Sequence, residues 1–197
     1  MGEWRTSDEA AWPLPGHQCD GPGTSVRSAT REAVGVSQGG CYGSNVSSTR
    51  ITRRLNAPRT TVYRALLDAD AVATWMVPTG MTSHVHAFDP REGGAFRISL
   101  TYDAPTGTGK TTAHTDTYHG HFVRLVPNEQ VIEVVEFETE DPALQGEMTI
   151  TMTLTDTDGG TEITAVHDRL PPGLSSADNE TGWRLSLAKL AALVEAG

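Results

Sequence analysis

The C-terminal stretch constrains the fold most strongly, because it predicts a long amphipathic helix that needs a partner surface. Trp183, Leu187, Leu190 and Val194 are spaced at i, i+4, i+7 and i+11, which places them on one side of an α-helix. Residues 171–173 read Pro-Pro-Gly and end whatever element precedes them. Since one apolar side of a helix has to be buried, the rest of the chain must supply an apolar face.

The start of this helix is marked as well. Ser175 with Asp178 three residues later is a capping-box pattern, in which the serine side chain accepts a backbone N–H. An acidic residue in the first turn also suits the positive end of the helix dipole. We therefore expect the helix to begin directly after Ser175.

The partner surface is a run of predicted β-strands. In residues 95–102 and 148–154, every second residue is apolar, which is typical of strands with one buried face. Asp-Thr-Asp-Gly-Gly at 156–160 is a hairpin signal. The six strands expected before the last helix are 83–88, 95–102, 115–126, 130–138, 146–155 and 161–169.

One more strand and two short helices precede this run. Residues 50–57 are expected to form the strand, and Pro58 is well placed to start the first helix. The second helix is expected at 71–76. The order β-α-α-β6-α predicts an α+β fold, in which a curved antiparallel sheet carries the C-terminal helix across its concave side. The space between the sheet and the helix is either packed or left as a cavity.

The first part of the chain differs in texture from the rest. Residues 1–48 are rich in Gly, Ser, Thr and Pro and show no sustained period, which predicts a flexible or disordered extension. Both cysteines, Cys19 and Cys41, lie in it, and we expect them to be free thiols. Residues 49–197 are predicted to form the folded domain.

Composition and charge limit the partners. The chain has a net charge of −10, which argues against nucleic acid and against anionic membrane surfaces, because both attract clustered Lys and Arg. No stretch approaches the roughly 18 apolar residues of a membrane span. The N-terminus lacks the basic and apolar regions of a secretory signal, so a cytoplasmic location is expected.

Several short motifs follow one another in a fixed order from residue 49 to residue 196. They are Ala57-Pro58, Trp75 shortly before Pro78, DPREGGAFR at 89–97, Tyr118-His119-Gly120, VPNE at 126–129, MTITMTL at 148–154, GGTEIT at 159–164, His167 followed by LPPG at 170–173, and Gly182-Trp183. As an ordered set they resemble the START-like superfamily, also called SRPBCC. Within it they resemble the branch named for the activator of the heat-shock-protein-90 ATPase.

The resemblance implies a helix-grip fold, in which a curved antiparallel sheet of six to seven strands wraps the C-terminal helix and a deep pocket lies between the two. Members of the superfamily bind lipids, hormones, polyketides or other apolar molecules, so the first expected function is binding of a small, largely apolar ligand. Some members are cyclases or dehydratases, so an enzyme using the same cavity is the first alternative, and the sequence leaves catalysis open. The branch takes its name from a eukaryotic co-chaperone. The second alternative is therefore a protein-interaction module that contacts a chaperone, or a second copy of the chain, through its surface.

Aromatic and soft side chains at patterned positions are candidates for lining the pocket. They are Trp75, Phe96, Tyr118, Met152 and Trp183. Core packing is the simpler interpretation of each, and the two interpretations overlap because such a pocket is a core left partly empty.

Two polar residues are added to the candidates. Glu136 shares a strand face with Glu138 and could act as an acid or base if that face lined the cavity, although a solvated outer face is the more common setting for Glu. His167 ends the last strand near one end of any cavity, so that it could contact a ligand or anchor the Pro-Pro turn.

The paired histidines of two strands do not add a metal site. His84 with His86, and His119 with His121, are each spaced to share one face of a strand. No cysteine or carboxylate lies nearby at ligand spacing, and solvent exposure is the favoured interpretation. We therefore predict no metal and no cofactor.

Overall fold

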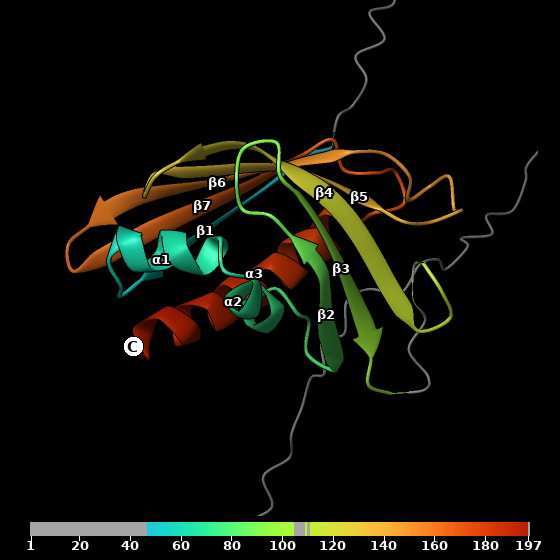
Figure 1. Ribbon diagram of the computed structural model, residues 1–197, viewed down its shortest axis with the longest axis horizontal. Coiled ribbons are helices and arrows are strands. Elements are labelled where there is room, and N and C mark those ends of the chain that lie inside the picture. The colour runs from blue at the N-terminus through green and yellow to red at the C-terminus, as the bar shows by residue number, and fades with distance from the viewer. Residues whose placement is uncertain (1–46, 105–108, 110, 197) are drawn as a thin grey trace, which may run out of the picture. The chain divides into compact units, whose positions relative to one another are not determined.

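The computed structural model describes residues 47–104, 109 and 111–196. Within these residues the elements follow in the predicted order, a strand, two short helices, six strands and a long helix (Figure 1). The strands are β1 (Thr49–Leu55), β2 (Met81–Phe88), β3 (Ala95–Tyr102), β4 (Thr115–Val126), β5 (Gln130–Phe137), β6 (Met148–Thr157) and β7 (Gly160–Asp168). The helices are α1 (Arg59–Leu66), α2 (Ala69–Trp75) and α3 (Ser176–Glu195). The flexible extension expected over residues 1–48 lies outside the described residues, apart from Ser47 and Ser48, and so do Cys19 and Cys41.

The described strands form one antiparallel sheet in the order β1-β7-β6-β5-β4-β3-β2. Strands β2 to β7 are a meander in which each strand pairs with the next. Strand β1 pairs with β7, with Ile51 opposite Ala165. The sheet is curved, and α3 crosses its inner side together with the two short helices (Figure 1). The expected α+β helix-grip architecture is confirmed.

The predicted apolar side of α3 faces the sheet. Trp183, Leu187, Leu190 and Val194 are all buried, and burying a side chain of this size stabilises a fold by about 1.5–3 kcal/mol. The helix begins where the sequence predicts, because the side-chain oxygen of Ser175 accepts the backbone N–H of Asp178 at 3.4 Å.

Element boundaries differ from the sequence prediction by a few residues, for local reasons. Helix α2 begins at Ala69 rather than at position 71, because the Asp68 side chain caps it by accepting the backbone N–H of Ala71 at 2.8 Å. Strand β6 begins at Met148 rather than at position 146, because Gly146 has a φ of +117° and lies in the preceding turn.

Alternate residues of the strands point to the inner side of the sheet. On β6 these are Met148, Ile150, Met152 and Leu154, all buried. On β4 the inner row includes Gly120, where a Cβ atom would collide with the carbonyl oxygen of Val134 and the ring of Phe96. The inner rows, α3 and the short helices together enclose the core, and the space left within it positions the candidate site.

Among the described residues, no helix is long and apolar enough to cross a membrane.

Candidate functional site

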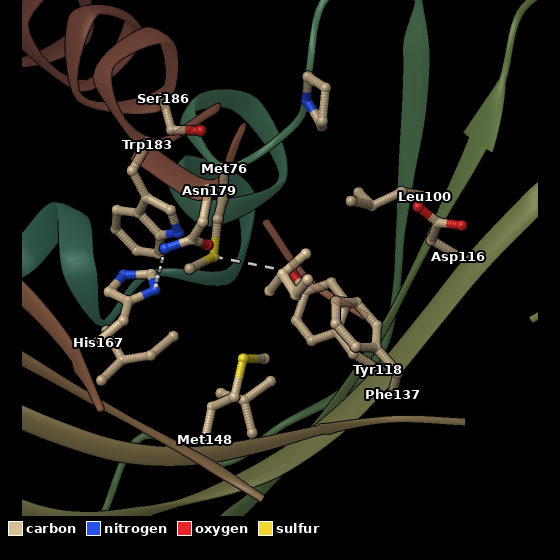
Figure 2. A pocket seen from close by; sticks show the side chains of 14 residues that line it. Met76, Leu100, Asp116, Tyr118, Phe137, Met148, His167, Asn179, Trp183 and Ser186 are labelled. Atoms are coloured by element: carbon tan, nitrogen blue, oxygen red, sulfur yellow. Dashed lines mark hydrogen bonds between the residues drawn. The ribbon is translucent and has the colours of Figure 1, made fainter. Parts of the chain in front are cut away.

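A cavity of about 70 Å³ lies between the inner side of the sheet and α3 (Figure 2). Its wall is mainly apolar, with contributions from the end of α2 and from strands β3 to β6. The main apolar side chains are Met76, Leu100, Val135, Phe137, Met148 and Ile150. The polar side chains are Asp116, Tyr118, His167, Asn179 and Ser186. Such a lining, apolar with a few fixed polar groups, is typical of small-molecule sites.

A buried hydrogen-bond chain fixes one side of this cavity. The Asn179 side-chain amide on α3 donates to the Thr49 hydroxyl at 2.7 Å and to His167 Nδ1 at 3.1 Å. Since Nδ1 accepts, the proton of the ring is on Nε2. Burial lowers the pKa of His167 to about 4, so the ring is neutral at pH 7 and a weak base.

The imidazole also packs against tryptophan. The ring planes of His167 and Trp183 meet at 84°, with centroids 4.4 Å apart, and Trp183 in turn meets Trp75 at 66° and 6.1 Å. His167 Nε2 has no hydrogen-bond partner in the part of the chain that the structure describes. An edge-to-face arrangement of this kind gives the imidazole ring a favourable contact, which is weaker than a hydrogen bond. Together with the Asn179 bond it fixes His167 as a positioned part of the wall.

A second, smaller cavity of about 10 Å³, the inner cavity, lies between the sheet and the two short helices α1 and α2. Trp75, Phe96, Met152 and Tyr118 line it, and so does Glu133 of β5. Met76 and Tyr118 line both cavities, and the Tyr118 hydroxyl donates to Met76 Sδ at 3.6 Å.

Glu133 is the carboxyl group of the inner cavity. It is only 6% exposed, and burial raises its pKa from the ordinary value of 4.5 to about 7. The hydroxyl of Tyr118, itself buried, has a raised pKa because of burial and of the nearby Glu133. A carboxyl group that titrates near neutrality can accept or donate a proton, or pair with a cation.

Six of the seven residues expected in the pocket lie on the two cavities. Tyr118, His167 and Trp183 line the larger one, and Trp75, Phe96 and Met152 line the smaller one, together with Tyr118. The structure does not bring Glu136 to either cavity.

Glu136 points the other way because its strand alternates. Val131, Glu133 and Val135 are buried on the inner face of β5, whereas the Glu136 carboxylate accepts the backbone N–H of Gly146 at 3.1 Å. The solvated alternative considered for Glu136 therefore describes its position better, and the carboxyl group that β5 contributes to a cavity is Glu133. The signal that could have found it is its even spacing from Val131 and Val135.

The paired histidines lie on the opposite side of the sheet. His84, His86, His119 and His121 are all exposed, as the solvent interpretation predicts. His86 Nε2 lies 2.8 Å from the Ser99 hydroxyl, and His119 Nδ1 lies 3.5 Å from Glu138, which Arg97 holds in a two-pronged ion pair. No group of three or more His, Cys, Asp or Glu suited to a metal ion occurs among the described residues.

Comparison with known proteins identifies relatives of the whole domain. Residues 56–195 match the family described as "Activator of Hsp90 ATPase homolog 1-like protein". Protein CV1439 from Chromobacterium violaceum is 33% identical, with a TM-score of 0.68 over 75% of this chain and 96% of that one. Protein Ms6760 from Mycobacterium smegmatis shares the fold at 19% identity, with a TM-score of 0.60 over 76% and 95% of the two chains.

A third structure of the same fold is DynU16, a protein of the dynemicin biosynthetic locus. It is 23% identical, with a TM-score of 0.54 over 75% of this chain and 47% of that one. No curated protein matches the chain.

Proposed function

This chain belongs to the activator of Hsp90 ATPase homolog 1-like family. We propose that it binds a small, largely apolar molecule between the sheet and α3. The cavity of about 70 Å³ is the observation that carries the proposal. A well-packed core fills such space, because each void forfeits dispersion contacts. A void at the place where the sheet and α3 meet is therefore best explained by a molecule that fills it.

The cavity has to widen to hold a ligand of ordinary size. An apolar cavity of about 150 Å³ accepts benzene, and drug-sized ligands occupy roughly 300 Å³ or more. Met76 and Met148 stand on its wall, and unbranched thioether side chains change rotamer easily. We expect these two side chains to move aside, while the His167–Asn179 bond keeps its place.

Two further functions compete with simple binding. A cyclase or dehydratase would use an inward titratable group, and those that line the cavities are Asp116, Tyr118, Glu133 and His167. A co-chaperone-like module would need an apolar docking surface. The large apolar side chains exposed among the described residues are Val123 on β4 and Leu185 and Leu193 on α3, between 37% and 47% exposed. Single exposed apolar side chains are normal on any protein surface and do not amount to a docking patch. Ligand binding in the cavity is therefore favoured over docking to a chaperone.

A pair of matched variants tests the proposal. Val135→Phe places a ring in the cavity, whereas Val134→Phe makes the same change on the outer face of β5. With benzene as the probe, we expect the methyl NMR signals of Met76 and Met148 to shift in the native protein and in Val134→Phe. In Val135→Phe benzene affinity should fall about tenfold or more, because the added ring takes the space. Equal benzene shifts in both variants would contradict the proposal.

A further inference from the structure

The inner cavity holds a carboxyl group that the fold itself does not use. Glu133 is 6% exposed and borders the inner cavity, and its carboxylate takes part in none of the hydrogen bonds or ion pairs between the residues that the structure describes. Its neighbours on the same face, Val131 and Val135, are apolar. An unpaired carboxylate in such surroundings is costly, and an apolar residue there would make the fold more stable. The cavity beside it therefore points to a ligand that supplies the missing partner.

Two side chains belong to the walls of both cavities. Met76 and Tyr118 line both cavities, and their contact is a single hydrogen bond from Tyr118 Oη to Met76 Sδ at 3.6 Å (Figure 2). Thioether sulfur is a weak acceptor, and Met76 is the C-cap residue of α2, at the edge of a helix. Rotation of the Met76 side chain would join the two cavities into one deeper pocket that ends at Glu133.

We propose that the ligand is a small apolar amine, whose protonated nitrogen passes Met76 and pairs with the Glu133 carboxylate while its apolar part fills the larger cavity. This inference rests on the proposed function and names the chemical class of its ligand.

The walls around Glu133 favour a cation over other polar groups. They come from α1, α2, β2, β3, β4 and β6, and Tyr118 is the only other titratable side chain among them. The indole N–H of Trp75 already donates to the Ala65 carbonyl at 3.1 Å. This N–H is therefore not free to donate a hydrogen bond to an anion in the cavity. The aromatic side chains of Trp75, Phe96 and Tyr118 line the same small space, and aromatic rings can attract a cation.

Ionisation of Glu133 makes amine binding depend on pH. Burial raises the pKa of Glu133 to about 7, so the carboxylate that pairs with the amine is the minor form at pH 5. Amine affinity should therefore fall by about tenfold for each pH unit below that pKa, whereas a neutral ligand of the same shape should show no such slope.

The test compares n-pentylamine with n-pentanol, which has the same number of heavy atoms and no charge. Binding is followed by methionine-methyl NMR, because Met148 lines only the larger cavity and Met152 only the inner one. In the native protein at pH 8, we expect pentylamine to shift both signals. In Glu133→Gln its affinity should fall about tenfold or more, as for a charge-assisted contact, while pentanol binds both proteins equally.

The outcomes separate this inference from the proposed function. If pentylamine and pentanol both shift Met148 but pentylamine binds the native protein and Glu133→Gln equally, the cavity binds ligands and the amine assignment is wrong. If 2-pentanone binds more tightly at pH 5 than at pH 8, Glu133 donates a proton to a carbonyl instead, which also overturns it. If none of the three probes shifts Met148, the proposed function itself fails.

Discussion

Glu133→Gln is expected to stabilise the folded protein by about 3 kcal/mol at pH 8 and to change its stability little at pH 4. The pKa of Glu133 is raised by burial from 4.5 to about 7, so between these pH values the unfolded chain releases a proton that the folded chain keeps. The native protein therefore loses stability as pH rises through this window, and the neutral amide does not. Urea unfolding of both proteins across the pH range measures the difference.

A control and a second buried group make this result specific. Glu136→Gln changes the same chemical group on the outer face of β5 and should alter stability by about 0.5 kcal/mol or less.

His167 acts in the opposite direction, because its pKa is lowered from 6.5 to about 4 and stability is lost as pH falls through that range. Between pH 4.5 and 6.5 the effects of Glu133 and His167 on the free energy of unfolding offset each other. In Glu133→Gln only the effect of His167 remains, so stability should rise with pH over this range. Parallel pH curves for the native protein and Glu133→Gln would contradict the account.

Trp183→Ala is expected to reduce the free energy of unfolding by about 3–5 kcal/mol, the range for removing a buried tryptophan ring. The ring is buried between His167 and Trp75 and holds α3 against the sheet. Small domains are stable by only about 5–15 kcal/mol, so the loss is a large share of the total. Urea unfolding at pH 7 measures it.

The matched control lies on the same helix. Leu185 is 37% exposed on the other side of α3, and Leu185→Ala should cost about 0.5 kcal/mol or less. A loss of less than about 1 kcal/mol for Trp183→Ala would mean that the ring does not anchor the helix.

The fold could be predicted from the sequence because its signals are local and periodic. The spacing of Trp183, Leu187, Leu190 and Val194 assigns α3 and its buried face, and alternation assigns the strands of the meander. The pairing of β1 with β7 has no such local signal and was not predicted from the sequence. Capping by Asp68 and the turn at Gly146 shifted boundaries without changing the order of elements.

The site could be predicted only in part. Aromatic residues such as Trp75 and Phe96 are found by their pattern, since pocket and core positions share one apolar periodicity. Glu133 was missed because a carboxylate is usually solvated, although its spacing from Val135 places it on the inner face. The bond from Asn179 to Thr49 joins residues 130 positions apart, and no sequence pattern indicates it.

The space between the sheet and α3 should hold a small molecule in the protein as cells produce it, and native mass spectrometry shows whether it does. The chain is isolated under non-denaturing conditions from the cells that naturally produce it, and its mass is compared before and after denaturation. We expect one bound small molecule per chain, which is released on unfolding, is largely apolar and carries a basic nitrogen. Identical masses in both states, with no molecule released, would mean that the space between the sheet and α3 does not hold a ligand.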